Sequence, residues 1–312
     1  MQTILFATGI RGSQRCWKKL INAGSFYGVQ TIILGGNLTG GDIFLIEQCK
    51  AGYWTARWDR ENIRTSDAAT IAELESQARD AGFYPHRATS EEGEVLRSSA
   101  EARDKLLRKL ITKSISSWLK QSRKKLAGSG KRLFVLSGGA DPPYLGELFP
   151  DSDTVIWAQN KVLQLENGCP VINQGFSEPT PWKGTWEMEE DRLLDLLETQ
   201  ISEISDIYRA IFNMHAPPFN TGLDDVPADE LPETGPMGAR YAPMGSRAVR
   251  RVIEKYQPLL SLHGLTQGSR RQTRLGRTLC LNPGSLCRLG ILSGFLISLD
   301  ARGIHSFQPV QG

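Results

Sequence analysis

The sequence predicts an α/β protein, because short apolar runs alternate with stretches of helical periodicity. Five of the runs stop at a small, Gly-rich or His-bearing turn, as buried strands do when their ends meet at one edge of an open sheet. These runs and their turns cover residues 3–12, 31–40, 133–141, 210–218 and 259–267. We therefore expect the framework of an active site at that edge.

The bulk composition is that of an ordinary globular domain. The chain has 312 residues, of which 40% are hydrophobic and 23% charged, and this is enough to bury a sizeable core. A net charge of +3 is too small to indicate nucleic acid or a membrane surface as partner. No apolar stretch reaches the roughly 18–20 residues of a membrane helix, and residues 2–8 lack the basic start of a signal peptide. We expect a cytoplasmic protein.

The first elements are predicted in the order strand, helix, strand. A strand at about 3–8 leads to a helix for which Ser13 is the predicted N-cap and Gly24 the predicted stop. A second strand follows at about 30–34, and the crossover rule makes the pair parallel. The five cysteines form no CxxC pair, so we expect neither a zinc knuckle nor a disulfide framework.

Residues 42–130 are predicted to be a cap inserted into a single domain of residues 1–312. A hairpin-like piece at 53–58 alternates with period two, and helical patterns follow near 67–82 and 99–126. The core resumes after the Gly-rich residues 127–130. The remaining predicted strands lie near 131–136, 210–212, 259–262, 278–281, 291–298 and 304–309, and residues 153–175 contain several short apolar runs typical of a sheet. Helices are predicted near 187–208 and 246–256, the second capped by Ser246.

Taken in order, the five turns resemble the motifs of the calcineurin-like metallophosphoesterases, and the resemblance covers nearly the whole chain. The family pattern is D-x-H, G-D, G-N-[HD], an isolated His, and G-H-x-H. The corresponding residues here are Gly9-Ile10-Arg11, Gly36-Asn37, Gly138-Gly139-Ala140, His215 and Gly264-Leu265-Thr266-Gln267. The resemblance implies a sandwich of two βαβ sheets flanked by helices, with a helical and hairpin cap.

The resemblance also implies that the family's two-metal site is missing. In the family, two divalent cations held by His, Asp and Asn activate a hydroxide nucleophile. The degenerate ligand positions are Gly9, Arg11, Asn37, Gly139, Ala140, Leu265 and Gln267. His215 alone survives as a full ligand, with Asn37 as a weak one, and Ala140 cannot serve as general acid. No cofactor is expected; if one binds, we expect a single weakly held divalent ion (Mn, Fe, Zn or Mg).

The first functional hypothesis is a metallophosphoesterase-fold pseudoenzyme that is inactive or severely impaired and binds a phosphorylated small molecule or a protein partner. The alternative is an active metal-dependent phosphoesterase on an altered site, with one metal on His215 and Asn37 and with Arg11 replacing the second cation. A third hypothesis is a partner or nucleic-acid binder that uses the basic residues 101–132, which hold eleven Lys or Arg against two acids.

Four residues are candidates for ligand contact, each beside a plainer role. Arg11 either holds a phosphate or reaches to solvent or to Asp141. Asn37 either bonds a ligand or serves its Gly-rich turn. His215 either binds a metal or an anion or is satisfied locally, and His263 is either a site contact or structural. Four arginines, Arg270, Arg271, Arg274 and Arg277, form either a polyphosphate site or a solvated loop.

Overall fold

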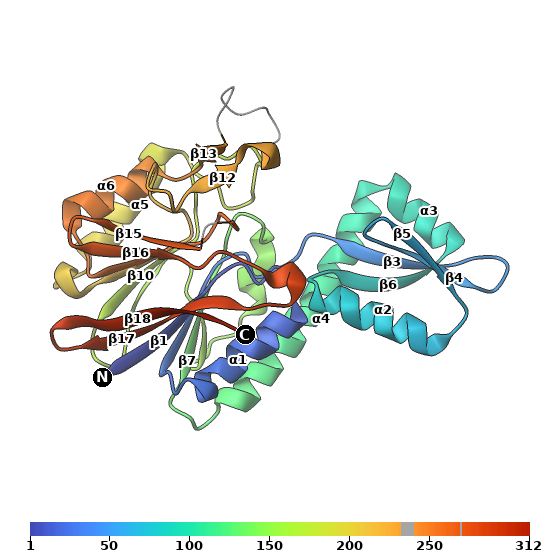
Figure 1. Ribbon diagram of the computed structural model, residues 1–312, viewed down its shortest axis with the longest axis horizontal. Helices are drawn as coiled ribbons and strands as arrows, with labels where there is room; N and C mark the ends of the chain where they lie inside the picture. Colours follow the sequence, from blue (N-terminus) through green and yellow to red (C-terminus); the bar gives the residue numbers. More distant parts are fainter. Residues whose placement is uncertain (232–239, 269) are drawn as a thin grey trace.

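The computed structural model describes residues 1–231, 240–268 and 270–312. Two six-stranded sheets with flanking helices make the larger part of the molecule, and a four-stranded sheet with its own helices projects from it (Figure 1). The described chain is therefore a mixed α/β protein, as predicted. The sequence also predicts an acidic, Pro-rich loop at about 216–245, and this loop lies partly outside the described residues.

The first sheet has the strand order β18-β17-β1-β2-β7-β8. Its strands are β1 (Gln2–Ala7), β2 (Thr31–Gly35), β7 (Arg132–Leu136), β8 (Val155–Trp157), β17 (Ser293–Asp300) and β18 (Gly303–Gln311). The first four run parallel, and β17 and β18 add on as an antiparallel pair. Strands β1 and β2 pair in parallel and are connected by a helix, so the predicted parallel pairing is confirmed.

The second sheet has the order β15-β16-β14-β11-β10-β9. Its strands are β9 (Lys161–Gln164), β10 (Pro170–Gln174), β11 (Ile211–Met214), β14 (Leu260–Leu262), β15 (Arg271–Leu275) and β16 (Thr278–Asn282). The four central strands are parallel, and β9 and β15 are antiparallel edges. The sequence pattern missed β15, because this edge strand carries arginines and no regular apolar alternation.

Three apolar cores hold these layers together. One lies between the two sheets, where Phe6 and Phe134 of the first sheet belong to the same cluster as Ile211 and Leu260 of the second. The outer face of the first sheet is covered by α1 (Gln14–Phe26) and α4 (Ala100–Leu126), whose Trp17 and Trp118 rings stack 4.9 Å apart. The outer face of the second sheet is covered by α5 (Glu190–Ser202) and α6 (Arg247–Tyr256). The result is a four-layer α/β/β/α sandwich.

The inserted unit has a fourth core of its own. Its elements are β3 (Ile43–Gln48), β4 (Trp54–Trp58), β5 (Glu61–Thr65), α2 (Ala68–Asp80), β6 (Tyr84–Thr89) and α3 (Ser90–Ser98). Phe44, Ile46, Ile71 and Leu74 are buried together there. By contrast, α4 packs into the sandwich through Ile111, Ile115 and Trp118. The stretch 42–130 is thus divided between two different cores.

Two predicted helix ends are wrong. Helix α1 passes through Gly24 to Phe26; a Cβ on Gly24 would lie 3.0 Å from Ile32 Cδ1, so this glycine allows close packing on β2. The helix predicted to reach 208 ends at Ser202, and the 3₁₀ turn η2 (Ile207–Arg209) follows. Its Ser and Asp residues compete for backbone hydrogen bonds and favour turns.

The remaining elements are short. They are β12 (Asp225–Pro227), β13 (Tyr241–Pro243), and the 3₁₀ helices η1 (Pro143–Leu148), η3 (Ala228–Glu230) and η4 (Cys287–Leu289). The predicted caps at Ser13 and Ser246 are confirmed, since their hydroxyls accept from Cys16 N–H and Val249 N–H. All five cysteines are free thiols. In the described parts of the chain, no helix is both long and apolar enough to span a membrane.

Candidate anion-binding site

A cavity of about 310 Å³ opens where the turns after β1, β2, β7 and β14 come together. Six of the seven degenerate positions line it: Arg11, Asn37, Gly139, Ala140, Leu265 and Gln267. The parallel strands of both sheets bring these turns to one rim, because the carboxyl ends of parallel strands point the same way. The seventh position, Gly9, is not part of the lining; its carbonyl accepts a hydrogen bond from the Ser285 hydroxyl.

Three of the lining residues have left-handed backbone conformations. The φ angles of Arg11, Asn37 and Leu265 are 47°, 53° and 60°. Asn tolerates this region, whereas Arg and Leu pay about 1–2 kcal/mol for it. Strained backbone conformations of this kind are enriched at functional sites, and they persist where the surrounding structure holds them in place. Here the turn after β1 bonds to the turn after β2, with Arg11 N–H donating to Asn37 O over 2.8 Å.

A buried carboxylate joins the turns of β2 and β7. Asp141 accepts hydrogen bonds from the backbone N–H groups of Leu38, Thr39 and Gly138 and from the Thr39 hydroxyl, at 2.7–3.0 Å. Its burial raises the pKa of the carboxyl, and the four donors oppose that shift. Asp141 therefore holds together two of the turns that line the cavity.

The Arg11 side chain is the least satisfied polar group at this rim. No described residue accepts a hydrogen bond from its guanidinium, and its Nε is buried without a partner. No Arg11–Asp141 ion pair within 4 Å exists among the described contacts, since the Asp141 oxygens are engaged by the turns. Burial lowers the pKa of Arg11, although the nearby Cys287 and Asp141 oppose this, and the group stays a cation at neutral pH.

Asn37 combines a turn role with an available donor. Its Oδ1 accepts from Ala140 N–H at 3.0 Å, which connects the turns after β2 and β7. No described group accepts from its side-chain amide nitrogen. Asn37 and Arg11 thus present donors to the same cavity, and neither contributes a carboxylate.

His215 lies beneath the cavity and is fully buried. Its Nδ1 is 2.8 Å from Gly35 O and must donate to it, so the neutral ring leaves Nε2 as a lone pair. That Nε2 is buried without a described partner. Burial lowers the pKa of His215 to about 4, and the Gly35 hydrogen bond only partly opposes this. Cβ atoms built on Gly36 or Gly138 would lie 2.5–2.6 Å from the ring nitrogens, so glycines give the ring its space.

His263 has a structural placement. It is fully buried, and its Nδ1 donates to the carbonyls of Met214 and Ala216 at 3.2 and 2.9 Å. Burial lowers its pKa to about 4. Neither His263 nor His215 lines the cavity, so of the four predicted ligand contacts the structure brings Arg11 and Asn37 to its surface.

The residues present do not fit a two-metal centre. The orphaned Nε2 of His215 suits a metal, but none of the seven degenerate positions supplies a carboxylate, and Arg11 adds a positive charge. The carboxylate of Asp141 is engaged by backbone N–H groups, and Glu230 lines the cavity without joining a metal-binding group of described residues. Across the described residues, no group of three or more His, Cys, Asp or Glu side chains is placed to hold a metal ion. An Asp at position 9 would also be obstructed, because a Cβ there would lie 2.9 Å from Ser285 Cβ and Gly9 has a φ of 63°.

The second wall of the cavity was not anticipated from the sequence. It comes from the segment between β10 and α5 and includes Thr180, Trp182 and Gly184. Two backbone-directed bonds hold this segment against the β7 turn: Thr185 N–H to Gly139 O and Trp186 Nε1–H to Asp141 O. The available signal was Trp182 itself, an aromatic in a Pro- and Gly-rich turn that is 44% exposed.

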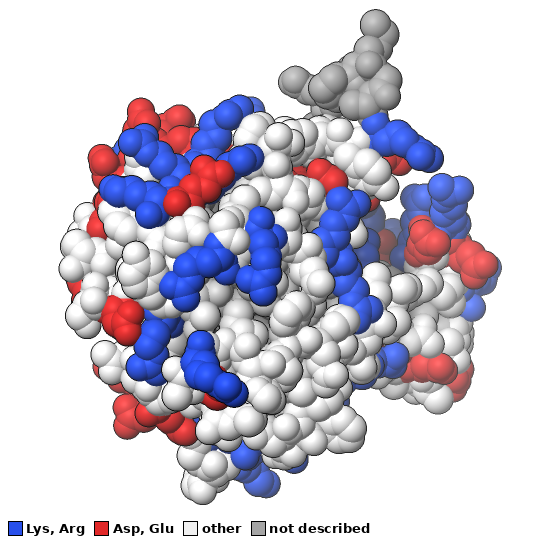
Figure 2. All heavy atoms as spheres, turned by 60° about the vertical axis from the view of Figure 1, so that its left-hand side comes forward, with Lys and Arg blue, Asp and Glu red and all other residues white. Residues whose placement is uncertain are grey.

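The arginines after the fifth turn lie on and near the edge strand β15. Arg271 forms an ion pair with Asp225, Arg274 donates to Arg277 O, and Arg277 lies over the Tyr208 ring. Figure 2, which brings this side forward, shows Lys and Arg side chains as separate groups among uncharged side chains and scattered Asp and Glu. Arg271, Arg274 and Arg277 are thus engaged within the protein, which disfavours a polyphosphate site. The predicted loop is in part the edge strand β15.

Comparisons with known proteins give a fold and no family. No protein-family model and no curated protein matches the chain. A crystal structure of TT1561 of Thermus thermophilus aligns with a TM-score of 0.52 at 13% identity, over 99% of this chain and 98% of that one. A second crystal structure aligns over the same shares with a TM-score of 0.55, also at 13% identity. Likeness at this identity shows a shared fold alone.

Proposed function

We propose that this protein binds a phosphorylated ligand in the cavity at Arg11 and does not hydrolyse it. It is then a metallophosphoesterase-fold protein whose two-metal site has been lost. The observation that carries the proposal is the Arg11 guanidinium, which is half-buried in a cavity without any described hydrogen-bond partner. A buried cation without partners is costly, and a phosphate supplies both charge and acceptors.

The surroundings of Arg11 fit such a ligand. The Asn37 amide adds a second donor, and the exposed Trp182 ring offers an apolar face to the rest of the molecule. The four-layer sandwich and the convergence of six degenerate positions on one cavity support the resemblance to metallophosphoesterases. Hydrolysis would need an activated water and a general acid, and Ala140 stands where the family has that acid.

The direct test is binding of O-phosphoserine, followed by residue-resolved amide NMR. We expect shifts at Asn37 and Gly139, and at least a tenfold loss of affinity in Arg11→Met, about 1.4 kcal/mol. Arg15→Met is the matched control, because Arg15 lies four residues on and pairs with Asp80 outside the cavity. Unchanged affinity in Arg11→Met contradicts the proposal.

Hydrolysis is tested separately. After Mn²⁺ loading, we expect no stoichiometric metal and no turnover of bis-p-nitrophenyl phosphate. Bound metal with turnover that disappears in His215→Ala would instead establish the alternative, a metal-dependent phosphoesterase that uses the orphaned Nε2.

A further inference from the structure

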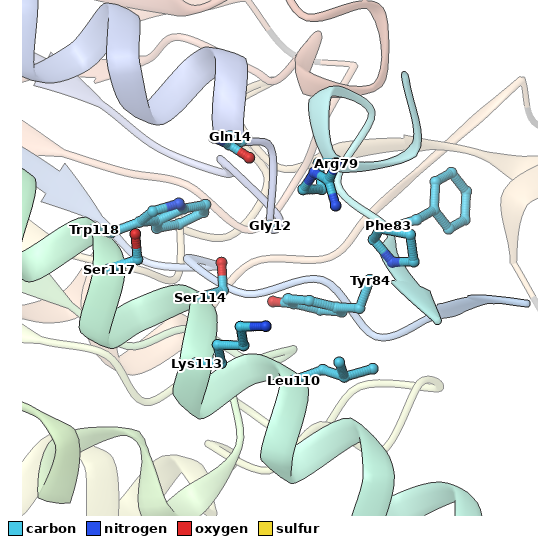
Figure 3. A pocket seen from close by; sticks show the side chains of 11 residues that line it. Gly12, Gln14, Arg79, Phe83, Tyr84, Leu110, Lys113, Ser114, Ser117 and Trp118 are labelled. Carbon is cyan, nitrogen blue, oxygen red and sulfur yellow. The ribbon is translucent and has the colours of Figure 1, made fainter. Parts of the chain in front are cut away.

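A second cavity, of about 200 Å³, lies where the inserted unit meets the sandwich. Its walls come from the start of α1, the end of α2 with the start of β6, and the middle of α4. Figure 3 shows the ends of Gln14, Arg79, Lys113 and Ser114 turned toward the space over Gly12. The turn of residues 9–12 separates this space from the cavity at Arg11, because Gly12 lines one and Arg11 the other.

The charges around this second cavity are unbalanced. Arg79 and Lys113 line it, and no carboxylate of the described residues does. The nearest partner of Arg79 is Glu75 at 3.7 Å, and Glu75 is shared with Arg87, which holds it at 2.6 Å. No ion pair of Lys113 occurs among the described residues. The two cations at the cavity therefore have only the shared carboxylate of Glu75 as a described partner.

Neutral donors complete the polar side. The α1 N-terminus points here; its first turn has no acidic residue, and no described acceptor takes the N–H groups of Gln14 and Arg15. These N–H groups and the helix dipole favour an anion. The Tyr84 hydroxyl accepts from Gly40 N–H at 3.2 Å, which leaves its own proton free to donate. The Ser114 hydroxyl lies beside them (Figure 3).

The rest of the lining is largely apolar. Phe83 and Pro85 flank Tyr84, and Leu110 and Trp118 lie on α4 on either side of Lys113 and Ser114. A ligand that fits both kinds of lining has a compact anionic head and a small apolar or aromatic body. Two cations with several N–H and O–H donors match the two charges and the acceptor oxygens of a phosphate monoester more closely than the single charge of a carboxylate.

We propose that this cavity is a second ligand site, which binds a small phosphate monoester with an apolar substituent between the insertion and the sandwich. Its head lies at the α1 N-terminus between Arg79 and Lys113, and its body lies against Phe83 and Leu110. The occupied site would connect α2 of the insertion to α1 and α4 of the sandwich. This site is independent of the ligand proposed at Arg11.

The test uses phenyl phosphate as probe on the full chain carrying Arg11→Met, which removes the other site. We expect amide shifts at Gln14, Arg15 and Ser114, and at least tenfold weaker binding in Lys113→Met and in Arg79→Met. Lys124→Met is the charge-matched control, since Lys124 lies on the same helix outside the cavity. Both tested side chains are surface cations, so the variants are expected to fold.

Three further probes fix the chemistry. Phenol tests the apolar body alone, and inorganic phosphate tests the head alone; we expect both to bind at least tenfold more weakly than phenyl phosphate. Benzoate distinguishes a carboxylate from a phosphate, and equal affinity for benzoate would overturn the assignment of the head. Amide shifts confined to Asn37 and Gln267 would overturn the site. An affinity for phenyl phosphate that stays unchanged in either Lys113→Met or Arg79→Met would also overturn it.

Discussion

Arg11 carries two unfavourable features at once, a left-handed backbone and a half-buried guanidinium without described partners. Strained residues of this kind are retained at functional sites, because selection tolerates a loss of stability when the residue contributes to function. Leu265, at the same rim, has the same backbone conformation.

Replacing Arg11 with glycine is therefore expected to stabilise the protein. Gly adopts the φ of 47° without strain, and the unpartnered cation is removed, so the free energy of unfolding should rise by about 1 kcal/mol. Urea denaturation measures the change, and Arg15→Ala on exposed helix surface should give none of this gain. A less stable Arg11→Gly protein would show that the guanidinium is satisfied in the fold.

Glu178 links stability to pH. The residue is 8% exposed, both carboxylate oxygens are buried without described partners, and burial raises its pKa to about 8. In the unfolded chain the pKa is near 4.3. Between these values the folded state binds the extra proton, so this group stabilises the fold at low pH, and that stability is lost as pH rises toward 8.

Glu178→Gln should remove this dependence. At pH 5 the variant and the wild type should be about equally stable, and at pH 9 the variant should be more stable by up to about 4 kcal/mol. Urea denaturation at both values decides the point, with Glu166→Gln as an exposed control. A difference that does not grow with pH would refute the role of Glu178.

The buried residues His215 and His263 have the opposite effect. Their pKa values of about 4 in the folded state mean that the fold loses stability as the pH falls below about 6.5.

At the scale of elements, α6 begins with a cap supplied from another helix. Glu190, in the first turn of α5, accepts from the Ser246 hydroxyl and from the N–H groups of Arg247 and Ala248 at 2.7–2.8 Å. A carboxylate at a helix N-terminus satisfies free N–H groups and complements the dipole. This contact joins the two helices that cover the second sheet.

Glu190→Ala should therefore destabilise the protein by about 2 kcal/mol, through the loss of three charge-assisted hydrogen bonds. Glu189→Ala is the control, because Glu189 makes no side-chain cap hydrogen bond. Chemical denaturation of both variants gives the comparison. Equal losses in the two would mean that the cap contributes nothing beyond helix propensity.

At the scale of the whole molecule, the four separate cores divide the chain into parts of unequal cooperativity. The insertion buries a small cluster around Phe44, whereas the sandwich buries three larger ones. Stability is seldom uniform across such parts, and small cores open first. The ligand proposed at Arg79 and Lys113 would lie across this division.

Phe44→Ala should loosen the insertion alone. We expect a local loss of about 3 kcal/mol, seen as faster amide hydrogen exchange in β3–β6 and unchanged exchange in β10 and β11. Phe212→Ala, in the core under the second sheet, should accelerate exchange across the sandwich instead. Uniform acceleration in Phe44→Ala would show that the two parts unfold as one.

The sequence determined the α/β class and most elements of the sandwich, because apolar periodicity and Ser caps are local signals. It also singled out six residues that line one cavity, through the turns that follow buried strands. Edge strand β15 and the Trp182 wall were missed, since polar edges and loops carry no periodicity.

Only the tertiary structure decided which candidates reach the surface of the cavity. His215 and His263 are buried beneath the rim, whereas Arg11 and Asn37 face the cavity with donors unused. Arg11 does not pair with Asp141, because backbone N–H groups already occupy the Asp141 oxygens. Two of these groups lie more than 100 residues away in the sequence, and one lies three residues away. Which groups satisfy one another is a property of packing, and distance along the chain does not encode it.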